Sequence, residues 1–456
     1  MRKLLNIFLI FSLIFNVSLL NISPSFAQGI KDVTKKTEKK KDKKNKPDNK
    51  SKCPDYDECD LEDDCSDSDE CDLNEDDECE SGTCKLTDKS KKKDKTEKPK
   101  KDKNSKKIEE DDDEEDEEES KNEPEIHNYD LVLDNIIAEA IYPSFILFAQ
   151  MNKELSETPL FHFYIEDENA HVKVTVEENE FMEPCVSEHD MTEKDECIFS
   201  PWIKWKRNAL LNADKPGFIN FSAVLEVNGK VKNRTHKTIT FRSVNEAILG
   251  FYEDGDKEEN YTDFSPLLSC FVNEDHPRID KVLNEIIDKD KKAKKITFFG
   301  YQGDSDKDVL NQMEWIWNYF AAKGTRYSDI TGSSNSSEKI NSQYIRFFEQ
   351  VIDNNQANCI DGTCMLASFY KKIGLDVNII LVPGHAFLAV AGKDRDEEGL
   401  PLKLYYLETT MMGEKDQNFK SALKSGQQEF EEYGEKDAYI VNVESCRAAG
   451  IMPLGR

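Results

Sequence analysis

The sequence has fewer basic than acidic residues and only one long apolar run. Its 456 residues include 62 Lys and Arg against 92 Asp and Glu, a formal net charge of −30. Nucleic-acid binding needs a basic surface that contacts phosphates, so this balance argues against that class of partner. The one long apolar run lies at the extreme N-terminus, so we expect no membrane span in the rest of the chain.

Residues 1–27 have the pattern of a secretory signal peptide. Arg2 and Lys3 precede an apolar stretch from Leu4 to Leu20, and Ser25-Phe26-Ala27 places small residues at the −3 and −1 positions of a cleavage site. We therefore expect an exported protein, periplasmic, secreted or held at the cell surface, with no transmembrane span once the signal is removed. An uncleaved N-terminal anchor is the alternative.

Residues 28–127 lack the apolar side chains that a core requires. Lysine blocks flank an acidic, cysteine-rich patch, and this composition predicts a disordered charged linker. Six cysteines lie in the patch at residues 53–84, and the sequence does not determine how they pair. The run at 64–71 resembles the acidic end of an LDL-receptor class A calcium module, but it is one residue short and has no aromatic core. We favour a disulfide-looped spacer over a calcium site, and calcium is the only cofactor that the sequence suggests.

Residues 128–250 have the pattern of a β domain. Val172, Val174 and Val176 alternate with polar residues, and Asn228-Gly229 separates two β-prone runs, at 218–227 and 231–241, as in a hairpin. Several short strands at this spacing predict an Ig-like β-sandwich. The histidines of this part show no metal-ligand spacing. Residues 251–304 are interpreted as a helical connection that begins a longer helix at Pro277.

Residues 305–456 combine helices with consecutive strands. Apolar periodicity predicts a helix over 306–322, and Asn358 is placed to cap another helix that starts at Cys359 and ends at Gly374. Strands are expected at 377–382, 385–391 and 402–409. Three consecutive strands after a helix predict an antiparallel sheet packed on that helix, so the fold class is α+β.

The predicted elements bring a cysteine, a histidine and a carboxylate together. Cys359 lies in the first turn of a helix, where the helix dipole and free N–H groups favour a thiolate. His385 is the only histidine in residues 277–456, so it must be the base if the domain uses one. Glu408 ends a neighbouring strand and is expected to accept the second imidazole N–H. Cys364 is the competing nucleophile, but both thiols cannot face His385, and we assign Cys364 to the core.

These residues resemble the transglutaminase-like superfamily of papain-related enzymes. The matching runs are Asn358-Cys359-Ile360-Asp361, Gly374-Leu375, Gly384-His385-Ala386-Phe387 and Leu407-Glu408-Thr409-Thr410. Residues 317–413 also look like a group of bacterial secreted proteins that carry this domain behind a β module. The sequence departs from the family pattern in two places: Asn358 stands for the usual Gly, and Glu408-Thr409 stands for Asp-Pro.

The resemblance implies a papain-like catalytic domain at 305–456, with Cys359 as nucleophile, His385 as base and Glu408 as the residue that orients the base. The implied activity is hydrolysis or acyl transfer at an amide bond of a peptide or protein, with cell-wall peptide as one substrate class. No metal or cofactor is implied at this site. The alternatives are a catalytically degenerate domain that binds the cell surface or cell wall, and a calcium-dependent surface adhesin.

Secondary roles fall to three further side chains. Gln343 or Gln356 is a candidate side-chain donor to the oxyanion, beside the backbone N–H of Cys359. Arg346 lies among apolar residues, and we expect it to pair with an acid rather than bind a substrate carboxylate.

Overall fold

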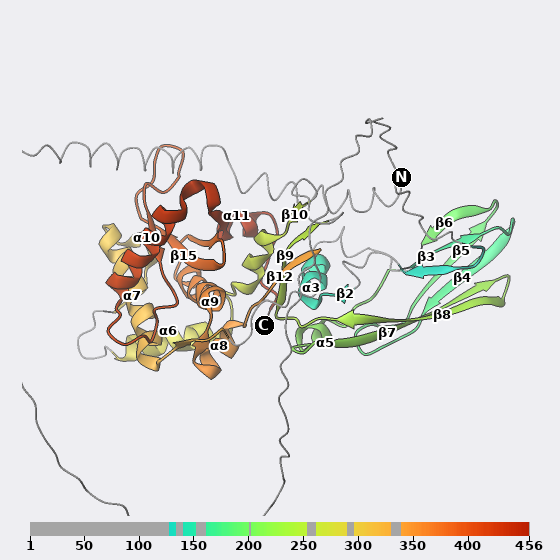
Figure 1. Ribbon diagram of the computed structural model, residues 1–456, viewed down its shortest axis with the longest axis horizontal. Coiled ribbons are helices and arrows are strands. Elements are labelled where there is room, and N and C mark those ends of the chain that lie inside the picture. Colours follow the sequence, from blue (N-terminus) through green and yellow to red (C-terminus); the bar gives the residue numbers. More distant parts are fainter. Residues whose placement is uncertain are drawn as a thin grey trace, which may run out of the picture. The chain divides into compact units, whose positions relative to one another are not determined.

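The fold is a mixed α+β architecture with several sheets, as the sequence predicts (Figure 1). The computed structural model describes residues 127–133, 140–151, 161–199, 202–252, 261–289, 296–329 and 339–455, and these belong to one compact unit. The signal sequence at 1–27, the linker apart from its last residue and the cysteine-rich patch at 53–84 lie outside the described residues. The structure therefore does not test what the sequence predicts for these residues.

A five-stranded sheet forms the main part of the region predicted to be β. Asn228 and Gly229 have φ of 50° and 75°, which confirms the hairpin turn, because a type I′ turn needs positive φ at both positions. Val172, Val174 and Val176 are fully buried, as their alternation predicts. The strands follow the order β2 (Ala140–Ile141), β8 (Lys230–Phe241), β7 (Gly217–Val227), β4 (Ala170–Val176) and β5 (Cys185–Met191), antiparallel except for the β2–β8 pair.

Two smaller sheets accompany it. One contains β1 (Leu131–Leu133), β3 (Phe161–Ile165) and β6 (Asp195–Phe199), and the other contains β10 (Tyr261–Asp263), β9 (Glu246–Tyr252) and β12 (Ile340–Tyr344). β9 and β12 are antiparallel, although they are far apart in sequence. The predicted boundary at residue 250 falls inside β9, and the side chain of Asn245 donates to the carbonyl oxygen of Ile345 at 2.7 Å. The β region and the C-terminal region therefore share a sheet.

The ends of the helices before the C-terminal sheet are marked by proline and glycine residues. Pro277 opens α6 (Pro277–Lys289), and α7 (Asp306–Lys323) ends at Gly324 in the left-handed conformation, with φ of 75°. The structure confirms both predicted helices. The remaining helices of this part are α3 (Pro143–Met151), α5 (Arg207–Leu211) and the 3₁₀ helices η2 (Ser265–Phe271) and η3 (Gly300–Gln302).

The C-terminal sheet is antiparallel, as predicted. Its order is β16 (Leu404–Leu407), β15 (His385–Ala391), β14 (Val377–Val382) and β17 (Tyr439–Asn442). The helix α9 (Cys359–Lys372) packs on β14 and β15 (Figure 1). Preceding it are β11 (Arg326–Tyr327), α8 (Phe348–Asn354) and β13 (Gln356–Ala357), of which β11 and β13 form a short parallel pair.

Helix α10 (Phe419–Asp437) packs closely against β16. A Cβ atom at Gly426 would lie 2.8 Å from the backbone nitrogen of Leu407, so only glycine allows this approach. The N–H of Glu408 donates to the carbonyl oxygen of Ala422 at 3.1 Å. Helix α10 therefore holds the end of the strand from which Glu408 projects.

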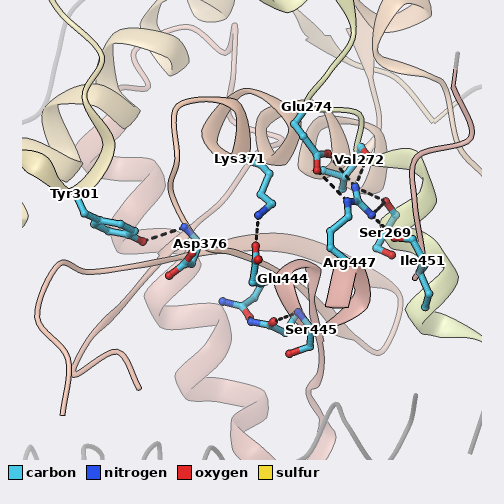
Figure 2. Close-up of polar contacts among 12 residues, drawn as sticks. Ser269, Val272, Glu274, Tyr301, Lys371, Asp376, Glu444, Ser445, Arg447 and Ile451 are labelled. Atoms are coloured by element: carbon cyan, nitrogen blue, oxygen red, sulfur yellow. Dashed lines mark hydrogen bonds and ion pairs between the residues drawn. The ribbon is translucent and has the colours of Figure 1, made fainter. Parts of the chain in front are cut away.

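An arginine fastens the last helix, α11 (Val443–Ala448), to η2 and the residues that follow it. The guanidinium of Arg447 donates to both carboxylate oxygens of Glu274, each at 2.9 Å. It also donates to the carbonyl oxygens of Ser269, Val272 and Ile451 (Figure 2). Burial raises the pKa of Glu274, but the hydrogen bonds and charge of Arg447 outweigh burial and lower it. This contact joins the C-terminal segment to the core.

Candidate active site

The nucleophile candidate lies at the start of α9, where a capping box fixes the helix. The side-chain oxygen of Asn358 accepts from the N–H of Asp361 at 2.9 Å, and the Asp361 carboxylate accepts from the N–H of Asn358 at 3.0 Å. This confirms the predicted cap. It makes Cys359 the first helical residue, with its partly exposed side chain at the positive end of the helix dipole.

Asp361 also joins the helix start to the chain that follows β12. Its side chain is completely buried, and it accepts from the N–H of Arg346 at 2.7 Å and from the Arg346 guanidinium at 2.6 Å. Arg346 is 8% exposed, and it also donates to the carbonyl oxygen of Ser328. The predicted pairing of Arg346 with an acid is confirmed, and Asp361 is the partner.

His385 and Glu408 are brought together by neighbouring strands. His385 is the first residue of β15, directly after Gly384, whose positive φ of 75° allows the tight β14–β15 turn. Glu408 follows the last residue of β16 and is 5% exposed. The imidazole Nε2 lies 2.7 Å from Oε2 of Glu408, and Cys359 lies close enough to the imidazole to raise its pKa. The structure thus places all three sequence-predicted residues in contact through His385.

The environment favours a charged imidazole. Burial lowers the pKa of His385, but the hydrogen bonds and charges of Cys359 and Glu408 outweigh burial and raise it to about 10. Burial raises the pKa of Glu408, and the hydrogen bond and charge of His385 reverse this and lower it. The arrangement can therefore hold an imidazolium between a carboxylate and a sulfur at neutral pH, ready to donate a proton.

The His385–Glu408 pair predicts a specific pH dependence of stability. A histidine whose pKa is raised above 6.5 stabilises the fold fully below that value, and the contribution is lost as pH rises toward 10. A carboxyl whose pKa is lowered below 4.5 stabilises the fold above that value. We expect the difference in unfolding free energy between the wild type and His385→Gln to be largest between pH 4.5 and pH 6.5, and to shrink as the pH rises toward 10. Urea unfolding at a series of pH values measures it, and a difference independent of pH would contradict it.

Cys364 lies on the same helix but points into the core. It is 2% exposed, and burial raises the pKa of its thiol. Cys359 is the partly exposed thiol and the one that His385 contacts. The sequence-based assignment of Cys364 to the core is confirmed.

The two glutamines remain less well connected to the site. The side chain of Gln343, on β12, donates to the carbonyl oxygen of the adjacent Tyr344 at 3.0 Å. Gln356 lies on β13 opposite Arg326, three residues before Cys359. Their role as oxyanion donors stays a prediction.

Tyr327 is a neighbour of the site that sequence reasoning missed. It lies on β11 opposite Ala357 and is 48% exposed. Burial, followed by the charges of Cys359 and other nearby acidic groups, raises the pKa of its phenol. No local motif marks it, because its place beside Cys359 depends on the pairing of β11 with β13.

Within the described ranges, no group of three or more His, Cys, Asp or Glu side chains is arranged to hold a metal ion. In the same part of the chain, no helix combines the length and apolar character needed to cross a bilayer. Comparison with known proteins found no matching family model, curated protein or solved structure.

Proposed function

We propose that this protein is an exported, transglutaminase-like cysteine enzyme that cleaves or transfers acyl groups at amide bonds of peptides or proteins. One observation carries the proposal: His385 lies 2.7 Å from the carboxylate of Glu408 and beside the thiol of Cys359. A nucleophile, a base and a residue that orients the base form the minimal set for covalent acyl transfer.

The chemistry follows from the charges of these groups. The thiol proton of Cys359 passes to His385, and the sulfur attacks the amide carbonyl carbon to form a carbon–sulfur bond. His385 gives its proton to the leaving nitrogen as the carbon–nitrogen bond breaks, which leaves a thioester on Cys359. Water or an amine then attacks the thioester, His385 takes its proton, and the thiolate leaves. Glu408 keeps the imidazole oriented throughout.

The start of α9 supplies a donor for the oxyanion that forms during attack. The capping box uses the N–H groups of Asn358 and Asp361, so the N–H of Cys359 is not part of it. An N–H at a helix N-terminus stabilises developing negative charge. We propose that the N–H of Cys359 donates to the oxyanion of the tetrahedral intermediate. Cell-wall peptides are among the substrates that the proposal includes.

The proposal also includes two fold assignments, a papain-like domain and an Ig-like sandwich. The order of α9 followed by the antiparallel strands β14, β15 and β16 supports a papain-like domain at 305–456. The antiparallel strands β8, β7, β4 and β5 support an Ig-like sandwich at 128–250.

A test uses p-nitrophenyl acetate as the acyl donor. We expect intact-protein mass spectrometry to find one acetyl group per chain after brief exposure at neutral pH, and peptide mapping to place it on Cys359. Cys359→Ser should lose this rapid adduct, whereas Cys364→Ser, which changes the buried thiol of the same helix, should keep it. Adding a primary amine then distinguishes transfer from hydrolysis through the product formed.

The proposal fails if the native protein forms no adduct faster than the unfolded chain, or if the acetyl group is found equally on surface lysines. A folded protein with an unreactive Cys359 would support the alternative of a binding module without catalysis.

A further inference from the structure

The turn after β16 is tied to the main chain of the nucleophile. The hydroxyl of Thr409 donates to the carbonyl oxygen of Cys359 at 3.1 Å, and the hydroxyl of Thr363 donates to the same oxygen at 2.8 Å. The two hydroxyl oxygens lie 3.3 Å apart, and both side chains are buried. A direct hydrogen bond thus connects the residue after Glu408 to Cys359.

The next residue in the turn holds the carboxylate of Glu408. Its Oε1 atom accepts from the N–H of Thr410 at 2.8 Å and from the Thr410 hydroxyl at 2.6 Å, and Oε2 faces His385. Glu has one more rotatable bond than the Asp that is usual at this position in the transglutaminase-like superfamily, so its carboxylate has more orientations available. Thr410 limits them by binding the oxygen that His385 does not use.

A glycine allows the turn to approach α9 this closely. A Cβ atom at Gly362 would lie 3.1 Å from Oγ1 and 3.3 Å from Cβ of Thr409, which is tighter than ordinary contact. The small residue at 362 and the hydroxyl at 409 therefore together set the distance between helix and turn.

We propose that Thr409 and Thr410 are positioning residues that set the placement of the His385–Glu408 pair relative to the thiol of Cys359. Thr409 fixes the distance between the turn and the nucleophile's helix, and Thr410 fixes the orientation of the carboxylate. This proposal rests on the proposed function, since a positioning role has meaning only if the three residues act together.

Substitution of the two threonines is expected to change different quantities: the pKa of His385 for Thr410, and the alkylation rate of Cys359 for Thr409. In Thr410→Val the Glu408 carboxylate loses a donor and part of its orientation, so we expect the pKa of His385 to fall by roughly one unit. Thr410→Ser keeps the hydroxyl and should restore the wild-type value. Thr409→Val should leave this pKa near its wild-type value and slow alkylation of Cys359 about 10-fold at every pH, because the sulfur moves relative to the imidazole.

The experiment measures the pKa of His385 by NMR and the rate of Cys359 alkylation by iodoacetamide across pH, in the full chain and in each valine and serine variant. Thr262→Val, a buried hydroxyl on β10, is the matched control, and thermal unfolding confirms that each variant folds. The proposal is overturned if Thr410→Val and Thr410→Ser give the same pKa, or if Thr409→Val reacts like the control. The NMR result does not depend on catalysis, so failure of the acetylation test and failure of this proposal are distinguishable.

Discussion

Replacing His385 by glutamine is expected to slow the alkylation of Cys359 by iodoacetamide at least about 100-fold at pH 6, the scale of a lost acid–base group. The reason is that a charged imidazole, held by Glu408 at 2.7 Å, lies beside the sulfur of Cys359, and a positively charged neighbour generally makes a cysteine more reactive. Glutamine keeps a polar side chain of similar size but carries no charge. The rate of iodoacetamide adduct formation on the Cys359 peptide measures the effect.

The matched control is His276→Gln. His276 packs edge-on against Phe348, and its pKa is lowered, first by burial. It is a partly buried histidine outside the site, so its replacement should leave the alkylation rate of Cys359 near the wild-type value. If His385→Gln and His276→Gln reacted equally fast, the imidazole would have no part in activating the thiol.

Replacing Asp361 by alanine is expected to lower the free energy of unfolding by about 3–5 kcal/mol, the cost of removing one partner of a buried ion pair. Arg346 would be left buried with its charge uncompensated, and the N–H groups of Asn358 and Arg346 would lose their acceptor. Because the same carboxylate caps α9, the loss should also disorder the turn that presents Cys359. Urea unfolding monitored by tryptophan fluorescence measures the change.

The control for this effect is Asp353→Ala. Asp353 pairs with Arg278 at 2.6 Å, but both side chains are substantially exposed. Exposed pairs contribute about 0.2–1 kcal/mol, so this variant should be nearly as stable as the wild type. Equal losses in the two variants would show that burial of the Asp361–Arg346 pair has no special energetic role.

The parts of the fold that were predictable from sequence depend on neighbours in the chain. Asn358 and Gly374 mark the ends of α9, and Asn228-Gly229 marks a hairpin, because capping and turn formation require particular residues within a few positions. His385 was identified because it is the only histidine in its region. The consecutive strands after α9 then placed Glu408 beside it.

The parts that were missed depend on contacts between distant segments. The β9–β12 pairing, the choice of Asp361 as the acid that pairs with Arg346, and the hydrogen bond of Thr409 to Cys359 join residues that no short pattern relates. Thr409 was noticed in the sequence only as a departure from Asp-Pro, since its hydrogen bond exists only after β16 has paired with β15. The residues proposed to carry the chemistry were therefore easier to predict from sequence than those that hold them in position.

The contact between helix α10 and the end of β16 has a consequence for biosynthesis. The N–H of Glu408 is held by Ala422, and the close approach at Gly426 is needed for the helix to lie there. A ribosome makes the chain from its N-terminus, so Cys359 and His385 emerge before the residues that fix their acidic partner. A nascent chain that stops short of α10 thus carries Cys359 and His385 without the contacts that hold Glu408, so under the proposed function the three residues act together only after α10 has been made.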